Sequence, residues 1–165
     1  MFGIGEFIVY GVNGICRVEG LVSSPYDKTD TREYYFLVPV NNPSRSSIYT
    51  PVDNERVPMR RLMTAAEIDR LAARIPEIEL LSIPVEKQRR EIYRTVLGTL
   101  EPEGYVQIIK TVGHRRAALT AARKHFPMTD LEYGRMARHL LCSECAHVLG
   151  ISEREAEAYV LGKEA

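Results

Sequence analysis

Two different periods of hydrophobic and polar residues divide the chain. Up to about residue 60, short runs of β-branched and aromatic residues alternate with turns rich in Gly, Asn, Ser and Pro, which is the pattern of β-strands. From Thr64 onward, apolar residues recur three and four positions apart, which is typical of amphipathic helices. We therefore predict an α+β fold with two domains, a β-rich one over residues 1–60 and an all-α one over residues 61–165.

The first half predicts four strands and the start of a fifth. The strands cover residues 6–10, 15–22, 32–40 and 46–50, and Val57 opens the fifth. The pair Asn13-Gly14 readily takes positive φ, so we expect a tight turn between the first two strands. No helical pattern separates the strands, which favours a small antiparallel barrel over a parallel α/β sheet.

The second half predicts a compact bundle of helices joined by short loops. Thr64 and Ser152 each stand three residues before a glutamate, so each predicts a capping box at the start of a helix. We expect Thr129 or Asp130 to cap a long helix that ends at Gly150. The predicted helices cover residues 64–75, 85–97, 102–113, 114–124 and 130–149, followed by a short one from residue 152.

Composition places the chain among ordinary globular proteins. Hydrophobic residues make up 45% and charged residues 27%, and the formal net charge is zero, which argues against a protein that coats nucleic acid indiscriminately. No apolar run approaches the roughly 20 residues of a membrane-spanning helix. The N-terminus shows no basic region followed by an apolar core, so we expect a cytoplasmic protein.

The charge is unevenly distributed along the sequence. Residues 84–125 carry nine basic and four acidic side chains, a net charge of +5, and His114 and His125 could add to it. A local excess of this kind indicates directed contact with an anionic partner. A solvated helical face is the alternative interpretation of the same residues.

A metal or redox site is one candidate for the three cysteines. Cys142 and Cys145 stand three residues apart, with His139 and His147 on either side, and zinc accepts such ligands. Both thiols also continue the apolar stripe of a predicted helix, where free cysteine commonly serves as a small core residue. There is no second CxxC pair. We therefore expect no metal and no cofactor.

The sequence carries no catalytic signature that we can identify. It holds no glycine-rich phosphate loop, no nucleophile elbow and no HExxH motif. His114 and His125 stand beside basic residues at predicted helix ends, where a surface or phosphate-contact role is more typical than acid–base chemistry. We expect a protein that is not an enzyme.

Four segments of the first half occur in an order that is more specific than any single motif. They are Gly5-Glu6-Phe7-Ile8-Val9-Tyr10-Gly11, Gly14-Ile15-Cys16-Arg17-Val18-Glu19, Tyr34-Tyr35-Phe36-Leu37 and Ile48-Tyr49-Thr50-Pro51-Val52-Asp53-Asn54. With these segments, residues 1–60 resemble the polymerase-interacting domain shared by the CarD/CdnL regulators of bacterial transcription and the transcription-repair coupling factor. The second half resembles the CarD C-terminal domain more loosely, in helix number and in residues 89–94.

The resemblance implies a Tudor-like N-terminal domain that docks on the RNA polymerase β subunit through an exposed strand. Pairing of main chains across an interface supplies affinity without demanding particular side chains. Flanking prolines cannot donate to a sheet ladder and are typical of edge strands. Ile48 and Tyr49 could alternatively pack inside the barrel. The residues that would form this edge lie between Pro43 and Pro51, and they are Arg45, Ser46, Ser47, Ile48, Tyr49 and Thr50.

The resemblance also implies a helical domain on promoter DNA at the upstream edge of the melted bubble, where it stabilises the open complex. Lys87, Arg90 and Arg94 are spaced so that they share one helix face, and such residues suit phosphates. A solvated surface with intrahelical pairs such as Glu86–Arg90 is the alternative. The basic residues predicted to contact DNA are Lys87, Arg89, Arg90, Arg94, Arg115 and Arg116.

One departure from the family concerns this DNA contact. Family members carry a tryptophan near the start of the second helix of the C-terminal domain, where it wedges into the minor groove. This chain has no tryptophan, and Arg89 stands at that place. An arginine can enter a narrow minor groove but cannot unstack a base step as an apolar wedge does. The competing hypothesis is an adaptor that binds polymerase without contacting DNA. In either case we expect a monomer that does not bind membranes.

Overall fold

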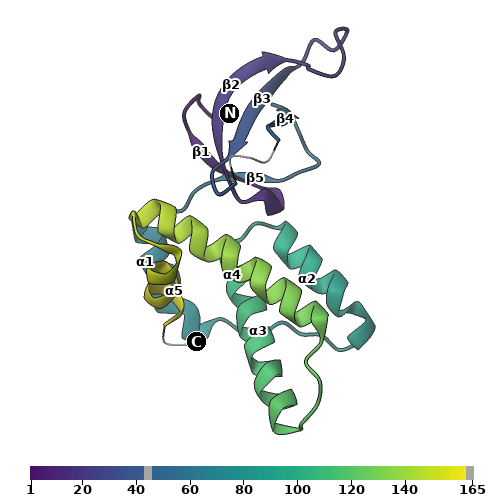
Figure 1. Cartoon of the computed structure of the whole chain (residues 1–165), viewed down its shortest axis with the longest axis vertical. Helices are drawn as coiled ribbons and strands as arrows, with labels where there is room; N and C mark the ends of the chain where they lie inside the picture. The colour runs from purple at the N-terminus through teal and green to yellow at the C-terminus, as the bar shows by residue number, and fades with distance from the viewer. Residues whose placement is uncertain (43–45, 163–165) are drawn as a thin grey trace. The chain divides into compact units, whose positions relative to one another are not determined.

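A computed structural model describes residues 1–42 and 46–162. The chain separates into two compact units, Met1–Leu62 and Met63–Ala165, which we call the strand unit and the helical unit. Strands occupy the first and helices the second (Figure 1). The predicted α+β fold class is confirmed.

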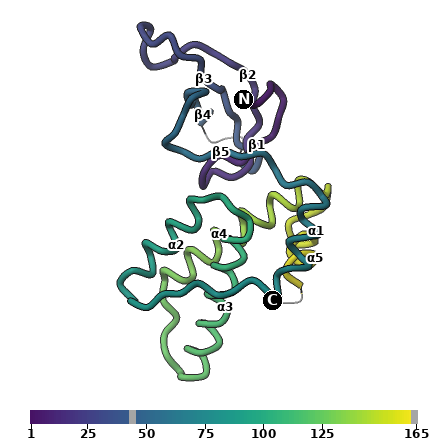
Figure 2. Tube along the Cα trace, turned by 180° about the vertical axis from the view of Figure 1, so that it is seen from behind, coloured from purple at the N-terminus to yellow at the C-terminus, as the bar shows by residue number. Residues whose placement is uncertain are grey.

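The described residues of the strand unit form a five-stranded sheet in the order β4-β3-β2-β1-β5. Figure 2 traces the path of the chain through these strands. Every neighbouring pair is antiparallel, as expected for strands joined without intervening helices. The fifth strand begins two residues later than Val57, the start that the sequence pattern indicated. The strands are β1 Phe7–Tyr10, β2 Ile15–Ser23, β3 Glu33–Pro39, β4 Ile48–Pro51 and β5 Met59–Arg61.

Alternate residues of these strands build the core of the strand unit. On β3, Tyr35 and Leu37 are almost fully buried, and Ile48 of β4 packs against the same cluster. The hydroxyl of Tyr35 accepts a hydrogen bond from the backbone N–H of Phe2 at 2.9 Å. This bond satisfies the one polar atom that the buried ring carries. The core therefore lies on one face of β3 and β4, and the intervening residues lie on the other face.

The predicted tight turn between β1 and β2 is confirmed, and only the place of its positive φ values differs from the Asn13-Gly14 pair. A short 3₁₀ turn, Gly11–Asn13, connects the strands, and the positive φ values fall on Gly11 (49°) and Gly14 (73°). The backbone N–H of Gly11 donates to the carbonyl of Pro58 at 3.0 Å. A Cβ on Gly11 would lie 2.8 Å from Val57. The turn thus begins at Gly11, because the backbone there lies close to the loop before β5 and leaves no room for a side chain.

Over residues 63–162, the helical unit contains five α-helices and two short 3₁₀ turns, Ile75–Glu77 and Glu86–Gln88. Both predicted capping boxes are confirmed. The backbone N–H of Glu67 donates to Thr64 Oγ1, and that of Glu155 donates to Ser152 Oγ, each at 3.2 Å. The α-helices are α1 Ala65–Arg74, α2 Arg89–Gly98, α3 Pro102–Ala121, α4 Met128–Leu149 and α5 Glu153–Leu161.

Three helix boundaries differ from the prediction. The two helices expected over residues 102–113 and 114–124 form the single helix α3, because Gly113 costs only about 1 kcal/mol within a helix whose neighbours pack well. Helix α2 begins at Arg89 after a 3₁₀ turn rather than at residue 85. Helix α4 begins after Pro127 and has no side-chain cap. Asp130, one of the two expected caps, is buried and binds other helices instead.

The core of the helical unit is centred on α3 and α4. A Cβ on Gly134 of α4 would lie 3.0 Å from Val112 of α3, so the glycine allows these two helices to approach closely. Glu144 of α4 is 1% exposed and accepts a 2.8 Å hydrogen bond from the backbone N–H of Met63, the first residue of the unit. No helix within the described residues is long and apolar enough to cross a bilayer.

Candidate functional site

Strand β4 forms one end of the sheet, and among the described strands it pairs only with β3. Just beyond the strand, the backbone N–H of Val52 donates to the carbonyl of Glu33 at 3.0 Å. Hydrogen-bonded and non-hydrogen-bonded pairs alternate along an antiparallel ladder. Ile48 and Thr50 therefore direct their backbone groups to β3, whereas Tyr49 directs its N–H and C=O to the outer edge.

Pro51 is the next outward-facing residue, and it has no N–H to offer. The outer edge of β4 thus presents a complete donor and acceptor pair at Tyr49, followed by the carbonyl of Pro51. A strand arriving from another protein would find this pair in the geometry that a sheet ladder uses.

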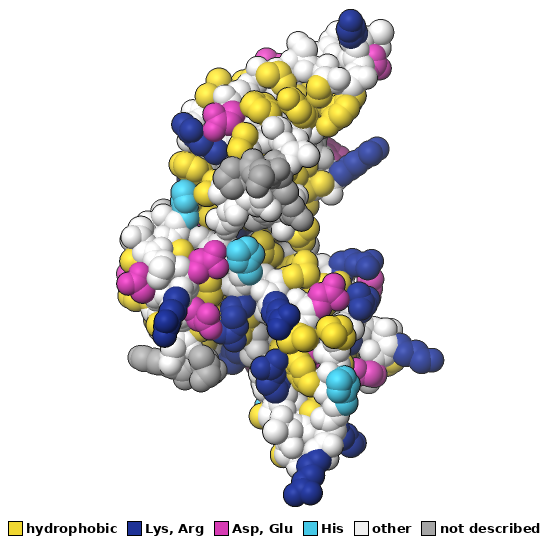
Figure 3. All heavy atoms as spheres, viewed as in Figure 1, with side chains coloured by type: hydrophobic (Ala, Val, Ile, Leu, Met, Phe, Trp, Pro, Cys, Tyr) yellow, Lys and Arg dark blue, Asp and Glu magenta, His cyan; other side chains and the backbone are white. Residues whose placement is uncertain are grey.

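Four aromatic residues cover the face of the sheet opposite the core. The rings of Phe36 and Tyr49 stack with centroids 5.1 Å apart. Tyr26 meets Tyr49 and Tyr34 edge-on, at 6.3 and 6.4 Å, although 75% of Tyr26 is exposed. We call these four residues the aromatic face. Figure 3 shows hydrophobic side chains gathered over the strand unit in that view.

Charged residues border the aromatic face at Tyr34. The Arg32 guanidinium lies 5.8 Å from the ring centroid of Tyr34 and binds Asp30 at 2.8 Å. Hydrogen bonds from Arg32, and then one from the Tyr34 hydroxyl, hold the pKa of Asp30 well below its usual range. The border of the aromatic face therefore carries a fixed ion pair.

The residues predicted to bind polymerase differ in their surroundings. Ser46 and Ser47 are exposed before β4 begins. Ile48 packs against the core, Tyr49 joins the aromatic face, and Thr50 is 2% exposed. Arg45 lies outside the described residues. Among the described residues of β4 in this predicted set, Tyr49 combines an outward-directed N–H with a side chain on the outer face.

The basic residues at the start of α2 form two groups. Lys87 is exposed in the 3₁₀ turn before the helix. The side chains of Arg90 and Arg94 are 53% and 65% exposed, and their carboxylate partners Glu132 and Glu91 lie at 3.7 and 3.5 Å. We call Lys87, Arg90 and Arg94 the basic face. The Glu86–Arg90 pair considered from the sequence is not among the ion pairs of the described residues, because Glu86 binds Arg89 and Arg115.

Arg89 and Arg115 belong to a polar network inside the helical unit. Arg115 binds Glu86 through two hydrogen bonds of 2.7 and 2.8 Å. Arg89 donates to Glu86 at 3.1 Å and to the Tyr93 hydroxyl at 2.9 Å. That hydroxyl donates to Asp130, which is 0% exposed, at 2.6 Å. We call these five residues the buried polar network, after its buried members Tyr93 and Asp130, whereas the Glu86 side chain is 61% exposed.

Asp130 joins the network to three helices. Its Oδ2 lies 3.1 Å from Nε of Arg115 on α3, an ion pair in which the N–H is not directed at the oxygen. Its Oδ1 accepts from Tyr93 on α2 and lies 3.5 Å from Arg89. The side chains of Arg89 and Arg115 are only 11% and 21% exposed. Two of the arginines predicted to contact DNA therefore bind carboxylates within the domain.

The network shifts the proton affinities of its members. Hydrogen bonds from Arg115, with a further contribution from Arg89, lower the pKa of Glu86 to about 2. Burial, together with the bond to Asp130, raises the pKa of Tyr93 to about 12. At neutral pH Glu86 is therefore ionised and Tyr93 is a neutral phenol. The last predicted DNA contact, Arg116, stacks on Phe126 with its guanidinium carbon 4.6 Å from the ring centroid.

The cysteines lie in the cores of the two units. Burial raises the pKa of Cys142 to about 12 and that of Cys16 to about 11, so both thiols stay protonated at neutral pH. His139 lies 3.3 Å from Glu153 on the surface. Among residues 1–42 and 46–162, no three His, Cys, Asp or Glu side chains come together in a way that could hold a metal ion.

A comparison with known families identifies the strand unit. Residues 2–63 match the family of the CarD-like/TRCF RID domain, and this range includes every strand of the sheet. The strand unit is thus similar to the CarD-like/TRCF RID domain. The resemblance inferred from the sequence is thereby confirmed for this part of the chain, and the match is consistent with a CarD-like protein. A RID domain indicates an interaction with RNA polymerase and a role in transcription. No curated protein matches the chain.

Sequence reasoning missed the buried polar network of the helical unit. Asp130 appeared to be a helix cap, although it precedes Tyr133 and Ala137 by three and seven residues. All three residues are buried on one side of α4. An acidic residue on an apolar stripe is a signal for a paired carboxylate, and this signal could have located the network.

Proposed function

We propose that the protein is a regulator of transcription that docks on the β subunit of RNA polymerase through the outer edge of β4. Its helical unit contacts promoter DNA near the upstream edge of the bubble and modulates the stability of the open complex. The observation that carries the proposal is the position of β4 at the end of the RID sheet, with the backbone of Tyr49 directed outward. The proposed function requires no catalysis and belongs in the cytoplasm.

Strand addition at β4 fits the surroundings of Tyr49. The outward N–H and C=O of this residue supply main-chain hydrogen bonds, and these need no particular partner sequence. The stacked Phe36 and Tyr49 rings lie on the adjoining face, and aromatic side chains of this kind anchor protein interfaces. A β-subunit strand would therefore receive both backbone pairing and side-chain contacts.

Contact with DNA is assigned to the basic face rather than to Arg89. Lys87, Arg90 and Arg94 extend from the first turns of α2 and from the turn before it, with large exposed fractions. Such residues position a protein on phosphates and carry little sequence information. Arg89, in contrast, is held by Glu86, Tyr93 and Asp130. We infer that it orients α2 and does not enter the minor groove.

A pull-down of the purified full chain with the isolated polymerase β lobe tests the polymerase contact. We expect saturable binding at micromolar concentration, in the range of transient interfaces of modest area. Absence of binding would remove the proposal. A preparation of the β lobe that still binds an unrelated β-directed partner serves as the control for its folding.

The adaptor hypothesis remains the second candidate, because Arg89 and Arg115 are bound within the domain. Retention of promoter complexes by the double variant Arg90→Glu/Arg94→Glu distinguishes the two. If the basic face binds DNA, retention falls, and the slope of log affinity against log salt decreases by about two. Arg154→Glu, a single exposed charge reversal on α5, is the control for a change of charge outside the basic face. Unchanged retention and slope, with β-lobe binding intact, would favour the adaptor.

A further inference from the structure

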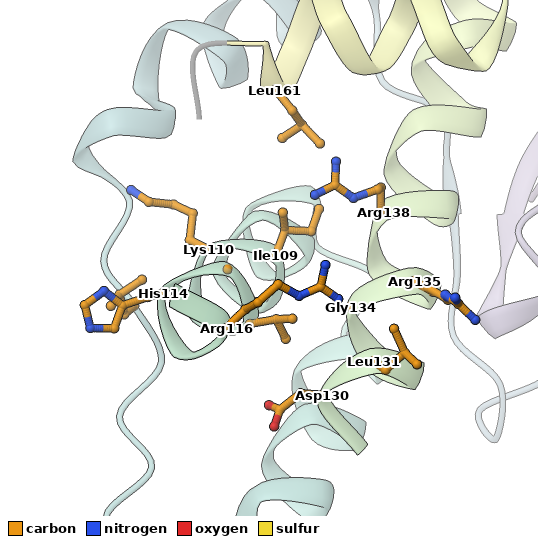
Figure 4. Close-up of a pocket in the computed structure, with 13 residues that line it drawn as sticks. Ile109, Lys110, His114, Arg116, Asp130, Leu131, Gly134, Arg135, Arg138 and Leu161 are labelled. Atoms are coloured by element: carbon orange, nitrogen blue, oxygen red, sulfur yellow. The ribbon is translucent and has the colours of Figure 1, made fainter. Parts of the chain in front are cut away.

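A cavity of about 650 Å³ lies within the helical unit, between α3 and α4, and neither proposed interface uses it. Figure 4 shows the residues that line it. Most of them come from the two helices, and the others are Leu80 and Leu161. The volume falls within the range of roughly 300–1,000 Å³ that is usual for small-molecule sites.

Two arginines converge on this cavity. In Figure 4 the side chains of Arg116 on α3 and Arg138 on α4 extend toward one another across Ile109. Like charges that share one space repel each other, and an anion placed between them turns the repulsion into attraction. The guanidinium of Arg116 is supported by the Phe126 ring. Arg138 binds Glu157 through one nitrogen, Nη1, and keeps other donors.

The remaining charged residues of the lining are already oriented elsewhere. Nζ of Lys110 donates to the carbonyls of Ile75 and Ile78 at 2.8 and 2.7 Å. Arg135 points away from the other two arginines (Figure 4). Among the described lining residues, Asp130 alone is acidic, and its carboxylate binds the buried polar network. The described lining therefore carries more basic than acidic side chains.

The rest of the lining is apolar, and two glycines shape it. Ile109, Val112, Leu131 and Leu161 contribute hydrocarbon surface. Gly134 lets α3 and α4 approach, whereas a Cβ on Gly113 would meet nothing within 4 Å. Gly113 thus leaves part of the cavity open. A bound molecule would meet donors at one end and hydrocarbon at the other, which suits an organic body attached to an anion better than a free ion.

We propose that this cavity binds a phosphorylated small molecule of nucleotide size, with its phosphate between Arg116 and Arg138 and its organic body against the apolar lining. Guanidinium groups match phosphate oxygens with paired, charge-assisted hydrogen bonds. The site does not depend on the polymerase or DNA contacts proposed above. Its test therefore needs neither partner.

Calorimetric titration of the full chain at low salt tests the site. The probes are ATP, GTP and pyrophosphate, with adenosine and guanosine as unphosphorylated controls. We expect saturable binding of one molecule of ATP or GTP per chain, weaker binding of pyrophosphate and no binding of the nucleosides. Absence of nucleotide binding at millimolar concentration would overturn the proposal. Pyrophosphate binding as tight as that of the nucleotides would also overturn it, because the apolar lining would then contribute nothing.

Two pairs of variants locate the binding. Gly113→Leu adds a side chain at a lining position where a Cβ meets nothing within 4 Å, and Gly98→Leu makes the same change on α2, where a Cβ also meets nothing within 4 Å. Arg116→Ala removes a converging arginine, and Arg135→Ala removes the one that points away. We expect Gly113→Leu and Arg116→Ala to weaken nucleotide binding about tenfold or more, while the two controls leave it nearly unchanged. Equal effects within each pair would contradict this location.

Discussion

The proposed function depends on two surfaces, the outer edge of β4 and the basic region around α2. They differ in the direction in which their polar groups point. At β4 the backbone of Tyr49 is directed outward, and the aromatic face lies beside it. Around α2 two arginines are directed inward, because Arg89 and Arg115 both lie against the buried Asp130. Basic residues that stand close together in a sequence can therefore bind partners inside a domain as well as lie on its surface.

This difference separates residues that bind a partner from residues that hold other side chains in place within the domain. Substitutions in the buried polar network should lower mainly the free energy of unfolding of the helical unit. Substitutions at the β4 edge should weaken mainly the binding of the partner. The predictions below use this distinction, beginning with the largest expected effect.

Asp130→Ala should cause the largest loss of stability in the helical unit. The change leaves Arg89 and Arg115 without their buried carboxylate partner, and breaking a buried pair in this way costs about 3–5 kcal/mol. Denaturant unfolding followed by helical circular dichroism measures the effect. Glu132→Ala, two residues away on α4 and 49% exposed, is the control and should change little. Equal effects of the two variants would mean that the network does not stabilise the unit.

Gly11→Ala should destabilise the strand unit by about 1–3 kcal/mol, because Gly11 has a φ of 49° and a Cβ would lie 2.8 Å from Val57. Hydrogen exchange of the strand amides reports this loss. Gly20→Ala on β2, where a Cβ meets nothing within 4 Å, is the matched control. Unchanged exchange in Gly11→Ala would contradict the turn described here.

Acidification should lower the stability of the helical unit by less than Asp130→Ala does. The pKa of Glu86 falls from 4.5 to about 2 in the folded chain. The stabilisation from its ionised form is therefore present above about pH 4.5 and is lost as the pH falls toward 2. The side chain is 61% exposed, so solvent reduces the effect. Thermal unfolding at a series of pH values should show a smaller acid dependence in Glu86→Gln, and an unchanged dependence would contradict the assignment.

Local patterns predicted most of the elements, and contacts between distant residues account for what they missed. The strands and the two capping boxes follow from residues a few positions apart, as at Thr64 and Glu67. The turn at Gly11 depends on a hydrogen bond to the carbonyl of Pro58. The inward orientation of the Arg89 side chain depends on Asp130, 41 residues away. Spacing along one helix cannot reveal such partners. Gly113 is an example in the other direction. A glycine disfavours a helix locally, but the packing of its neighbours keeps α3 continuous at this position.

Binding of the polymerase β lobe to Tyr49→Pro and Tyr49→Val variants tests the central claim most directly. Proline removes the outward N–H, which β3 does not use, whereas valine removes the ring and keeps that N–H. Hydrogen exchange of the core strands establishes that both variants stay folded. We predict that Tyr49→Pro loses β-lobe binding about tenfold or more, while Tyr49→Val is weakened less. Wild-type affinity in folded Tyr49→Pro would show that polymerase does not add a strand at this edge.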